Sequence, residues 1–219
     1  IFLISCLNIL TRFINIFSSI YFMKRVEHVN IEKGMNVNAL VKTMKETGVM
    51  GAGRLGKSVD ILEKMINDKD CKVFFGQAGA LVPGGMRNIL ADLLRRKLVD
   101  VFVTTGATLT HDLVEALGFP HEVGTSEADD KELNKKGKDR MWDSYMNNKA
   151  YEKMEDFFDE HWQDFSKAKT ISALINLIGS KVQDKNSILR VAYEQKIPVF
   201  CPALADSGIG LMIYGRKMK

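Results

Sequence analysis

The chain has 219 residues, of which 46% are hydrophobic and 26% are charged, a composition typical of a soluble globular protein with one sizeable core. Its net charge is +4, and basic residues are interleaved with acidic ones, so nucleic acid is not an expected partner. The cysteines, Cys6, Cys71 and Cys201, lack the spacing of metal ligands, and no metal site is expected. Reduced thiols in a cytoplasmic protein are the predicted state.

Residues 1–22 are apolar enough to suggest a membrane segment. They start at Ile1, lack a basic leading region, place Arg12 and Asn15 in mid-span, and have no small-residue cleavage site before Met23. We therefore expect Met23 to be the true start and residues 1–22 to be a non-native, translated upstream segment. A genuine hydrophobic N-terminal segment is the alternative; no membrane association is expected.

Two helices are predicted next, one capped by Asn36 and ending at Gly48, and one with an apolar stripe from Leu55 to Ile66. The stretch Gly51–Ser58 matches the phosphate-binding pattern G-x-x-x-x-G-K-[ST] and the pattern G-x-G-x-x-G. Both patterns need a buried strand before the loop, whereas an amphipathic helix precedes this one. We expect both matches to be coincidental.

Two strand–loop–helix units follow. The first has a strand at Cys71–Phe75, a loop with four glycines from Gly76 to Gly85, and a helix at Met86–Lys97. The second has a strand at Val99–Val103, a threonine-rich loop at residues 104–108, and a short helix ending near Leu117. Small residues after neighbouring strands indicate a nucleotide site, because loop amides and helix N-termini can bind phosphate groups.

The rest of the chain predicts a polar surface excursion at residues 124–138 and helices at 151–165, 171–178 and 187–195. A third strand is expected at Ile197–Cys201. Asp206 follows that strand and could accept hydrogen bonds from a ribose, or could instead form an Asx-turn or a helix cap. Together the elements predict an α/β fold with three layers and a mostly parallel, Rossmann-like sheet, its ligand at the carboxyl ends of the strands.

Two separated segments resemble motifs of the deoxyhypusine synthase family. One runs from Cys71 to Asp112 and includes VDVFVTT; the other, IPVFCPALADSGIG, ends at Gly210. The resemblance extends from about Val29 to the last residue, so residues 23–219 are identified as part of a deoxyhypusine synthase-like NAD-binding domain. It implies an enzyme that uses NAD to transfer the aminobutyl group of spermidine to one lysine of the translation initiation factor 5A precursor. It also implies a homotetramer.

The resemblance implies roles for particular residues. NAD would be contacted by Gly79, Ala80, Leu81, Val82, Pro83, Thr105, Gly106, Ala107 and Asp206. The polyamine would lie near Thr110, His111 and Asp112. The catalytic lysine of the family lies beyond Lys219, so the resemblance predicts that this chain alone is inactive and poorly stable.

The chain departs from the eukaryotic pattern at the polyamine positions. Acidic residues of that pattern are replaced by Thr110, His111 and Leu211. Among residues 110–112, only Asp112 is acidic. His111 could serve as a base toward an amine, or could be a helix cap or packing residue. These departures point to an archaeal or bacterial-type branch. They leave open a homospermidine synthase-like transferase acting on a related polyamine, and a non-catalytic partner subunit.

Overall fold

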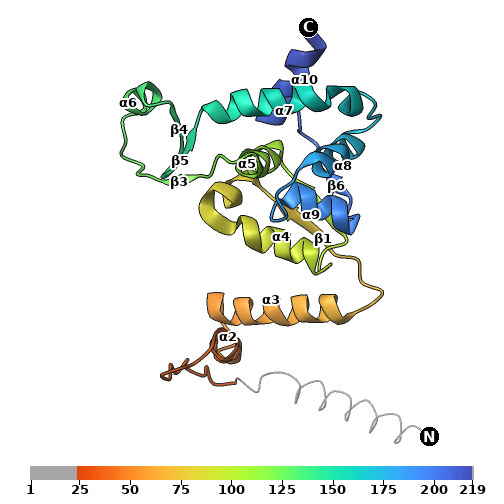
Figure 1. Ribbon diagram of the computed structural model, residues 1–219. Helices are drawn as coiled ribbons and strands as arrows, with labels where there is room; N and C mark the ends of the chain where they lie inside the picture. The colour runs from red at the N-terminus through yellow and green to blue at the C-terminus, as the bar shows by residue number, and fades with distance from the viewer. Residues whose placement is uncertain (1–23, 219) are drawn as a thin grey trace, which may run out of the picture. The chain divides into compact units, whose positions relative to one another are not determined.

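The computed structural model describes residues 24–218, so the predictions for residues 1–22 and for Cys6 lie outside the described residues. The chain divides into two compact units, with the boundary between Asn67 and Asp68. Each unit is described by itself (Figure 1). No helix among the described residues is long and apolar enough to cross a membrane.

The described part of the first unit is a pair of helices, α2 (Val37–Glu46) and α3 (Met50–Asn67). The Asn36 side chain accepts a hydrogen bond from the Ala39 amide at 2.9 Å, which confirms the predicted cap. A Cβ added at Gly56 would lie 2.3 Å from the Cβ of Lys45, so this glycine lets the two helices approach closely. The whole stretch Gly51–Ser58 is helical, and therefore has no phosphate-binding loop conformation.

The second unit contains a parallel sheet of three strands in the order β1-β2-β6. The strands are β1 (Phe74–Gln77), β2 (Val101–Thr104) and β6 (Val199–Phe200). The predicted parallel sheet is thus present, although each strand is shorter than expected or shifted along the chain. The first strand begins late because the Asp100 carboxylate, rather than a neighbouring strand, accepts the Val73 amide at 2.9 Å.

The two faces of this sheet differ in burial. Phe102 and Val199 lie on the face that packs into the core, and the ring of Phe75 stacks on Phe102 at a centroid distance of 5.8 Å. The opposite face carries Phe74, which is 68% exposed, and Phe200, which is 48% exposed. The predicted three-layer, Rossmann-like arrangement remains a prediction, since only one face of the sheet is well covered.

Six longer helices belong to the second unit: α4 (Arg87–Arg95), α5 (Gly106–Ala116), α7 (Lys149–Phe165), α8 (Ile171–Lys181), α9 (Ile188–Gln195) and α10 (Gly208–Met218). The periodicity predicted the first five of them. Helix α9 packs against α4, α5 and α8, while α7 packs against α5, α8 and α10 (Figure 1). Their apolar faces and the sheet form one core, whose largest fully buried side chains include Phe102, Phe158, Leu94, Leu109, Leu113, Met154 and Ile178.

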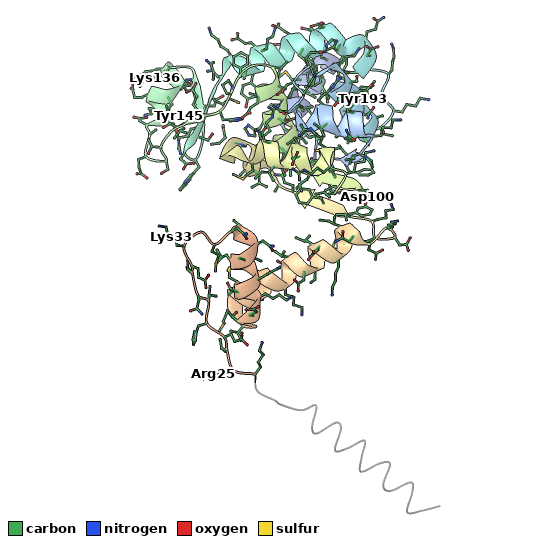
Figure 2. The ribbon with its side chains drawn as sticks, turned by 60° about the horizontal axis from the view of Figure 1, so that its bottom comes forward. Arg25, Lys33, Asp100, Lys136, Tyr145 and Tyr193 are labelled. Atoms are coloured by element: carbon green, nitrogen blue, oxygen red, sulfur yellow. The ribbon has the colours of Figure 1, made fainter. Side chains whose placement is uncertain are left out.

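The polar segment predicted as a surface excursion has structure of its own. Residues 124–138 contain α6 (Asp130–Lys135) and the first residue of β4 (Lys138–Met141). They follow β3 (Glu122–Val123), and β3 and β4 both pair with β5 (Ser144–Asn147) in an antiparallel sheet of order β3-β5-β4. Figure 2 shows Lys136 and Tyr145 in this region. The Tyr145 hydroxyl accepts from the Thr125 amide at 2.9 Å and donates to its carbonyl at 3.1 Å. These bonds, together with the strand pairing, order a segment that has little apolar pattern.

The two described cysteines are free thiols, as predicted. Cys201 is buried, and burial raises the pKa of its thiol above the ordinary value. Cys71 is half-buried and precedes β1 instead of lying within it.

Candidate functional site

The register of the parallel sheet brings the two predicted ligand loops together. Gln77, the last residue of β1, pairs with Thr104, the last residue of β2. The chain leaves β1 through a 3-10 turn, η1 (Gly79–Leu81), and a π-helical turn, η2 (Val82–Met86), whereas β2 leads directly into α5. Both loops therefore lie at the carboxyl edge of the sheet, where nucleotides bind in open α/β sheets.

Close backbone approaches join these loops at the first turn of α5. A Cβ added at Gly79 would lie 2.9 Å from the Cβ of Ala107. A Cβ added at Gly106 would lie 2.4 Å from the Cβ of Ser207, which belongs to the loop after β6. The loops after all three strands thus meet around one helix N-terminus.

A threonine cluster with one glutamine lines this junction. The hydroxyls of Thr104 and Thr108 donate to Gln77 Oε1 at 3.1 and 3.0 Å. Thr105 caps α5, because its hydroxyl accepts from the Thr108 amide at 3.5 Å. The Gln77 side-chain nitrogen is buried, and among the described residues it has no hydrogen-bond partner. A buried donor of this kind favours a ligand with an acceptor oxygen at the junction.

The predicted cofactor residues differ in what they can offer such a ligand. Gly79, Pro83, Thr105 and Ala107 are half-buried, Ala80, Leu81 and Asp206 are exposed, and Val82 and Gly106 are buried. The Val82 side chain belongs to the core, so only its backbone could reach a ligand. The Asp206 amide donates to the Ala203 carbonyl at 3.1 Å, which places this residue in a turn, and its carboxylate is exposed.

Asp112 has no exposed surface. Its carboxylate accepts from Arg87 Nε and from Ser187 Oγ, both at 2.7 Å, and from the amides of Ile188 and Leu189, both at 2.9 Å. Each oxygen has two donors, which uses the usual capacity of a carboxylate. In the structure, Asp112 therefore caps α9 and pairs with Arg87. Its expected role toward a polyamine stays a prediction.

Arg87 extends this buried network. Its Nη1 donates to Asp184 at 2.7 Å and lies 3.7 Å from Glu115 Oε2. Burial alone would lower the pKa of Arg87, but the charges and hydrogen bonds of Asp112 and Asp184 outweigh it and raise that pKa. Arg87 thus stays charged beneath the site, where it holds α4, α5 and the start of α9 together.

His111 belongs to a row of three polar side chains. His111 Nδ1 lies 2.9 Å from His121 Nε2, and His121 Nδ1 lies 2.6 Å from Glu115 Oε1. Burial, and to a smaller extent His121, lower the pKa of His111 to about 4, so this ring is neutral near pH 7. Burial acts to raise the pKa of Glu115, but its hydrogen bond with His121 and the charges of His121 and Arg87 lower it overall.

Thr110 is buried, and its hydroxyl accepts from the Ile209 amide at 3.2 Å near the start of α10. Leu211 is exposed. Of the three residues predicted near the polyamine, only His111 is partly exposed, and its Nε2 has no hydrogen-bond partner among residues 24–218. No group of three potential metal-ligating side chains occurs in the part of the chain that the structure describes.

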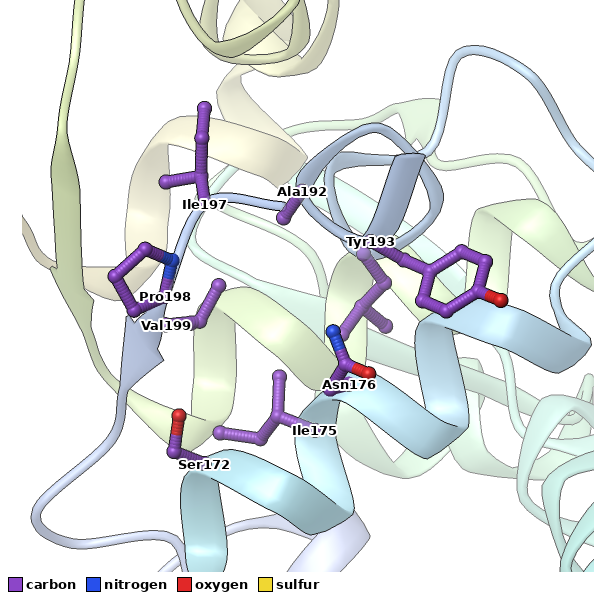
Figure 3. A pocket seen from close by; sticks show the side chains of 9 residues that line it. Ser172, Ile175, Asn176, Ala192, Tyr193, Ile197, Pro198 and Val199 are labelled. Carbon is purple, nitrogen blue, oxygen red and sulfur yellow. The ribbon is translucent and has the colours of Figure 1, made fainter. Parts of the chain in front are cut away.

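Two cavities lie away from this junction. A small one of about 30 Å³ is lined by residues of α8, α9 and the β6 segment, among them Ile175, Tyr193 and Pro198 (Figure 3). That volume is roughly the share of one water molecule, far too little for a nucleotide. A larger one of about 480 Å³ lies among α7, α8 and α10 and reaches Leu204 and Ala205, beside the loop that carries Asp206.

Sequence reasoning did not single out Gln77, Arg87, Glu115 or His121 as parts of the site. Glu115 is four residues from His111 on one helix, a spacing that does place side chains together. His121 and Arg87 come from other segments, and no local pattern indicates their contacts.

Comparison with known proteins gives consistent results. The family model described as deoxyhypusine synthase matches residues 39–219. A protein of Methanosarcina thermophila named probable deoxyhypusine synthase is 40% identical over 190 residues, covering 86% of this chain and 60% of that protein. Probable deoxyhypusine synthase 1 of Archaeoglobus fulgidus is 34% identical over 197 residues, covering 89% of this chain and 65% of that protein.

Among solved structures, a protein assigned as a deoxyhypusine synthase from Entamoeba histolytica superposes with a TM-score of 0.60 at 23% identity. The superposition covers 88% of this chain and 67% of that one, and it supports the similarity of fold. The chain spans about 60% of the length of the Methanosarcina relatives that it matches.

Proposed function

The chain belongs to the deoxyhypusine synthase family, and from that premise we propose that it takes part in NAD-dependent transfer of the aminobutyl group of spermidine to a lysine of the translation initiation factor 5A precursor. The observation that carries the proposal is the junction of three strand-end loops at the first turn of α5. We propose that NAD binds at this junction, in a cytoplasmic homotetramer.

The residues of the junction fit a dinucleotide. The N-terminus of α5 offers backbone amides and the positive end of a helix dipole to a pyrophosphate. The unpartnered Gln77 nitrogen offers a further donor. Gly79 keeps the neighbouring loop close to Ala107, and the exposed Asp206 carboxylate offers an acceptor for ribose hydroxyls. When bound, NAD supplies a hydride acceptor for oxidation of the amine carbon.

His111 is the residue of this chain proposed to act on the polyamine. Its ring is neutral near pH 7, and a neutral imidazole can accept a hydrogen bond from an amine N–H. It follows Ala107 by four residues on α5, so it lies on the same side of the helix as the proposed cofactor contact. The amine would therefore meet a hydrogen-bond acceptor one helical turn from the cofactor contact.

The proposal is tested by following label from spermidine. The longest protein that the locus encodes around these 219 residues is incubated with NAD, labelled spermidine and the factor precursor. Transfer of label to one factor lysine, absent when NAD is omitted, is the expected result. A protein that binds NAD but transfers no label to the factor would overturn the assignment of the acceptor.

One observation favours a second candidate, a homospermidine synthase-like transferase. Asp112 is saturated by Arg87 and by the start of α9, while Thr110, His111 and Leu211 carry no acid. Positions that hold polyamine ammonium groups in the eukaryotic pattern thus offer no free carboxylate here. In the same experiment, label that appears only in a free polyamine product would identify this second activity.

A further inference from the structure

Glu115, His121 and His111 form a continuous hydrogen-bonded row that ends at His111 Nε2, which has no hydrogen-bond partner in the described part of the chain. The two bonds measure 2.6 Å and 2.9 Å, and the His121 side chain is only 5% exposed. Glu115 follows His111 by four residues on α5, whereas His121 lies in the segment that leaves this helix. The row therefore depends on the folded structure and not on one helix alone.

The protonation of the side chains in this row decides which atom donates and which accepts in each of the two hydrogen bonds. An ionised carboxylate only accepts hydrogen bonds, so Glu115 requires a proton on Nδ1 of His121. A neutral His121 then has its lone pair on Nε2, which requires a proton on Nδ1 of His111. The remaining nitrogen of His111, Nε2, is left with a lone pair.

We propose that Glu115 and His121 are positioning residues that hold His111 in the Nδ1–H tautomer, so that His111 Nε2 accepts a hydrogen bond from an amine N–H. Through the two imidazole rings, the Glu115 carboxylate determines which nitrogen of His111 carries the proton, although position 111 itself carries no acid. That the amine is a polyamine rests on the proposed function. The tautomer itself does not.

Other charged groups around the row are fixed in place. Arg87 of α4 lies 3.7 Å from Glu115 Oε2, and it pairs with Asp112 on α5 and with Asp184 ahead of α9. Arg87 favours the ionised form of Glu115, and the two aspartates balance most of its charge. Arg87 of α4 therefore favours the same donor and acceptor assignment as Glu115 on α5.

The test is nitrogen-15 NMR of the full chain labelled at histidine, which has four such residues. At pH 8, long-range nitrogen–proton correlations should show a protonated Nδ1 and a bare Nε2 for both His111 and His121. An Nε2–H tautomer of His111 at pH 8 would overturn the proposal.

Two variants and a matched control separate positioning from general structure. Glu115→Gln and His121→Gln should each convert His111 to a mixture of tautomers, and tryptophan fluorescence verifies that each variant is folded. Glu160→Gln removes a carboxylate 3.9 Å from the ring of His161 and should leave the His111 signals unchanged. A pure Nδ1–H tautomer that persists in both row variants contradicts the inference.

Adding spermidine to the unmodified chain then tests the ligand separately. A shift of the His111 Nε2 resonance, absent in His121→Gln, is expected. If the pH 8 tautomer is as expected but spermidine shifts nothing, the proposed substrate fails while the positioning of His111 stands.

Discussion

Asp112→Asn changes one atom in a polar group of the site that has no exposed surface. The carboxylate oxygens each accept two hydrogen bonds, one from a side chain and one from an amide at the start of α9. In asparagine, one of the two positions becomes an NH2 group that faces two donors. Arg87 also loses its principal counter-ion, although Asp184 remains 2.7 Å away.

The expected loss follows from these contacts. Each hydrogen bond to a charged acceptor contributes about 1.5–3 kcal/mol, and two of the four are lost. Removing one partner of a buried ion pair costs about 3–5 kcal/mol, which agrees with that sum. With a slope of about 2 kcal/mol per molar urea, the unfolding midpoint should fall by about 1.5–2.5 M.

The assay is urea unfolding followed by tryptophan fluorescence. Both tryptophans, Trp142 and Trp162, lie in the second unit, so the signal reports the unit that contains Asp112. Asp156→Asn is the matched control: its carboxylate is exposed and lies 3.9 Å from Lys153. The control should change the free energy of unfolding by less than about 0.5 kcal/mol.

A loss below about 1 kcal/mol in Asp112→Asn would refute the reasoning, because it would mean that the four donors have equivalent partners elsewhere. The double variant Arg87→Met with Asp112→Asn provides a further check. It removes both charges, so its loss should be clearly smaller than the sum of the two single losses. Additive losses would show that the two side chains act independently.

Three other predictions concern the loops, His111 and the helix pair. Gly79→Ala places a Cβ within 2.9 Å of a side-chain carbon on α5, so NAD affinity measured by calorimetry should fall at least about tenfold, or roughly 1.4 kcal/mol. Gly84→Ala is the control, because a Cβ added at Gly84 meets no other atom. Equal NAD affinity in the two variants would contradict the prediction. The pKa of His111 is lowered to about 4 in the folded chain, so between about pH 6.5 and pH 4 the unfolded chain binds a proton that the folded ring does not. The free energy of unfolding should therefore fall by up to about 3 kcal/mol as the pH drops through this window. An NMR titration midpoint near 6.5 for this ring would count against the prediction. Gly56→Ala should speed amide hydrogen exchange in α2 and α3. Gly51→Ala should not, because a Cβ added at Gly51 has open space around it. Identical exchange in the two variants would show that the helices need no close approach.

The sequence predicted most helices well, because an amphipathic stripe is a local property that survives in the folded chain. Asn36 and Ser187 mark the starts of α2 and α9, and both side chains make the bonds expected of caps. Strand limits were less accurate. The apolar run at Cys71 begins three residues before β1, since Asp100 takes the Val73 amide out of the ladder.

The small antiparallel sheet had no clear signal in the sequence. Its order comes from strand pairing and from Tyr145, and contacts of this kind lie far apart along the chain. The predicted three layers likewise depend on what covers the face of Phe74 and Phe200, which strand periodicity cannot reveal.

By itself, then, the sequence determined the order of the elements, the glycine and threonine loops and the family to which the chain belongs. The tertiary structure decided which polar residues are free to meet a ligand. Asp112 carries a charge in the sequence, but folding surrounds it with four donors, while the uncharged His111 acquires His121 and Glu115 behind it. The physical reason is that a side chain's reactivity depends on its hydrogen-bond partners and burial, and these come from segments that only folding brings together.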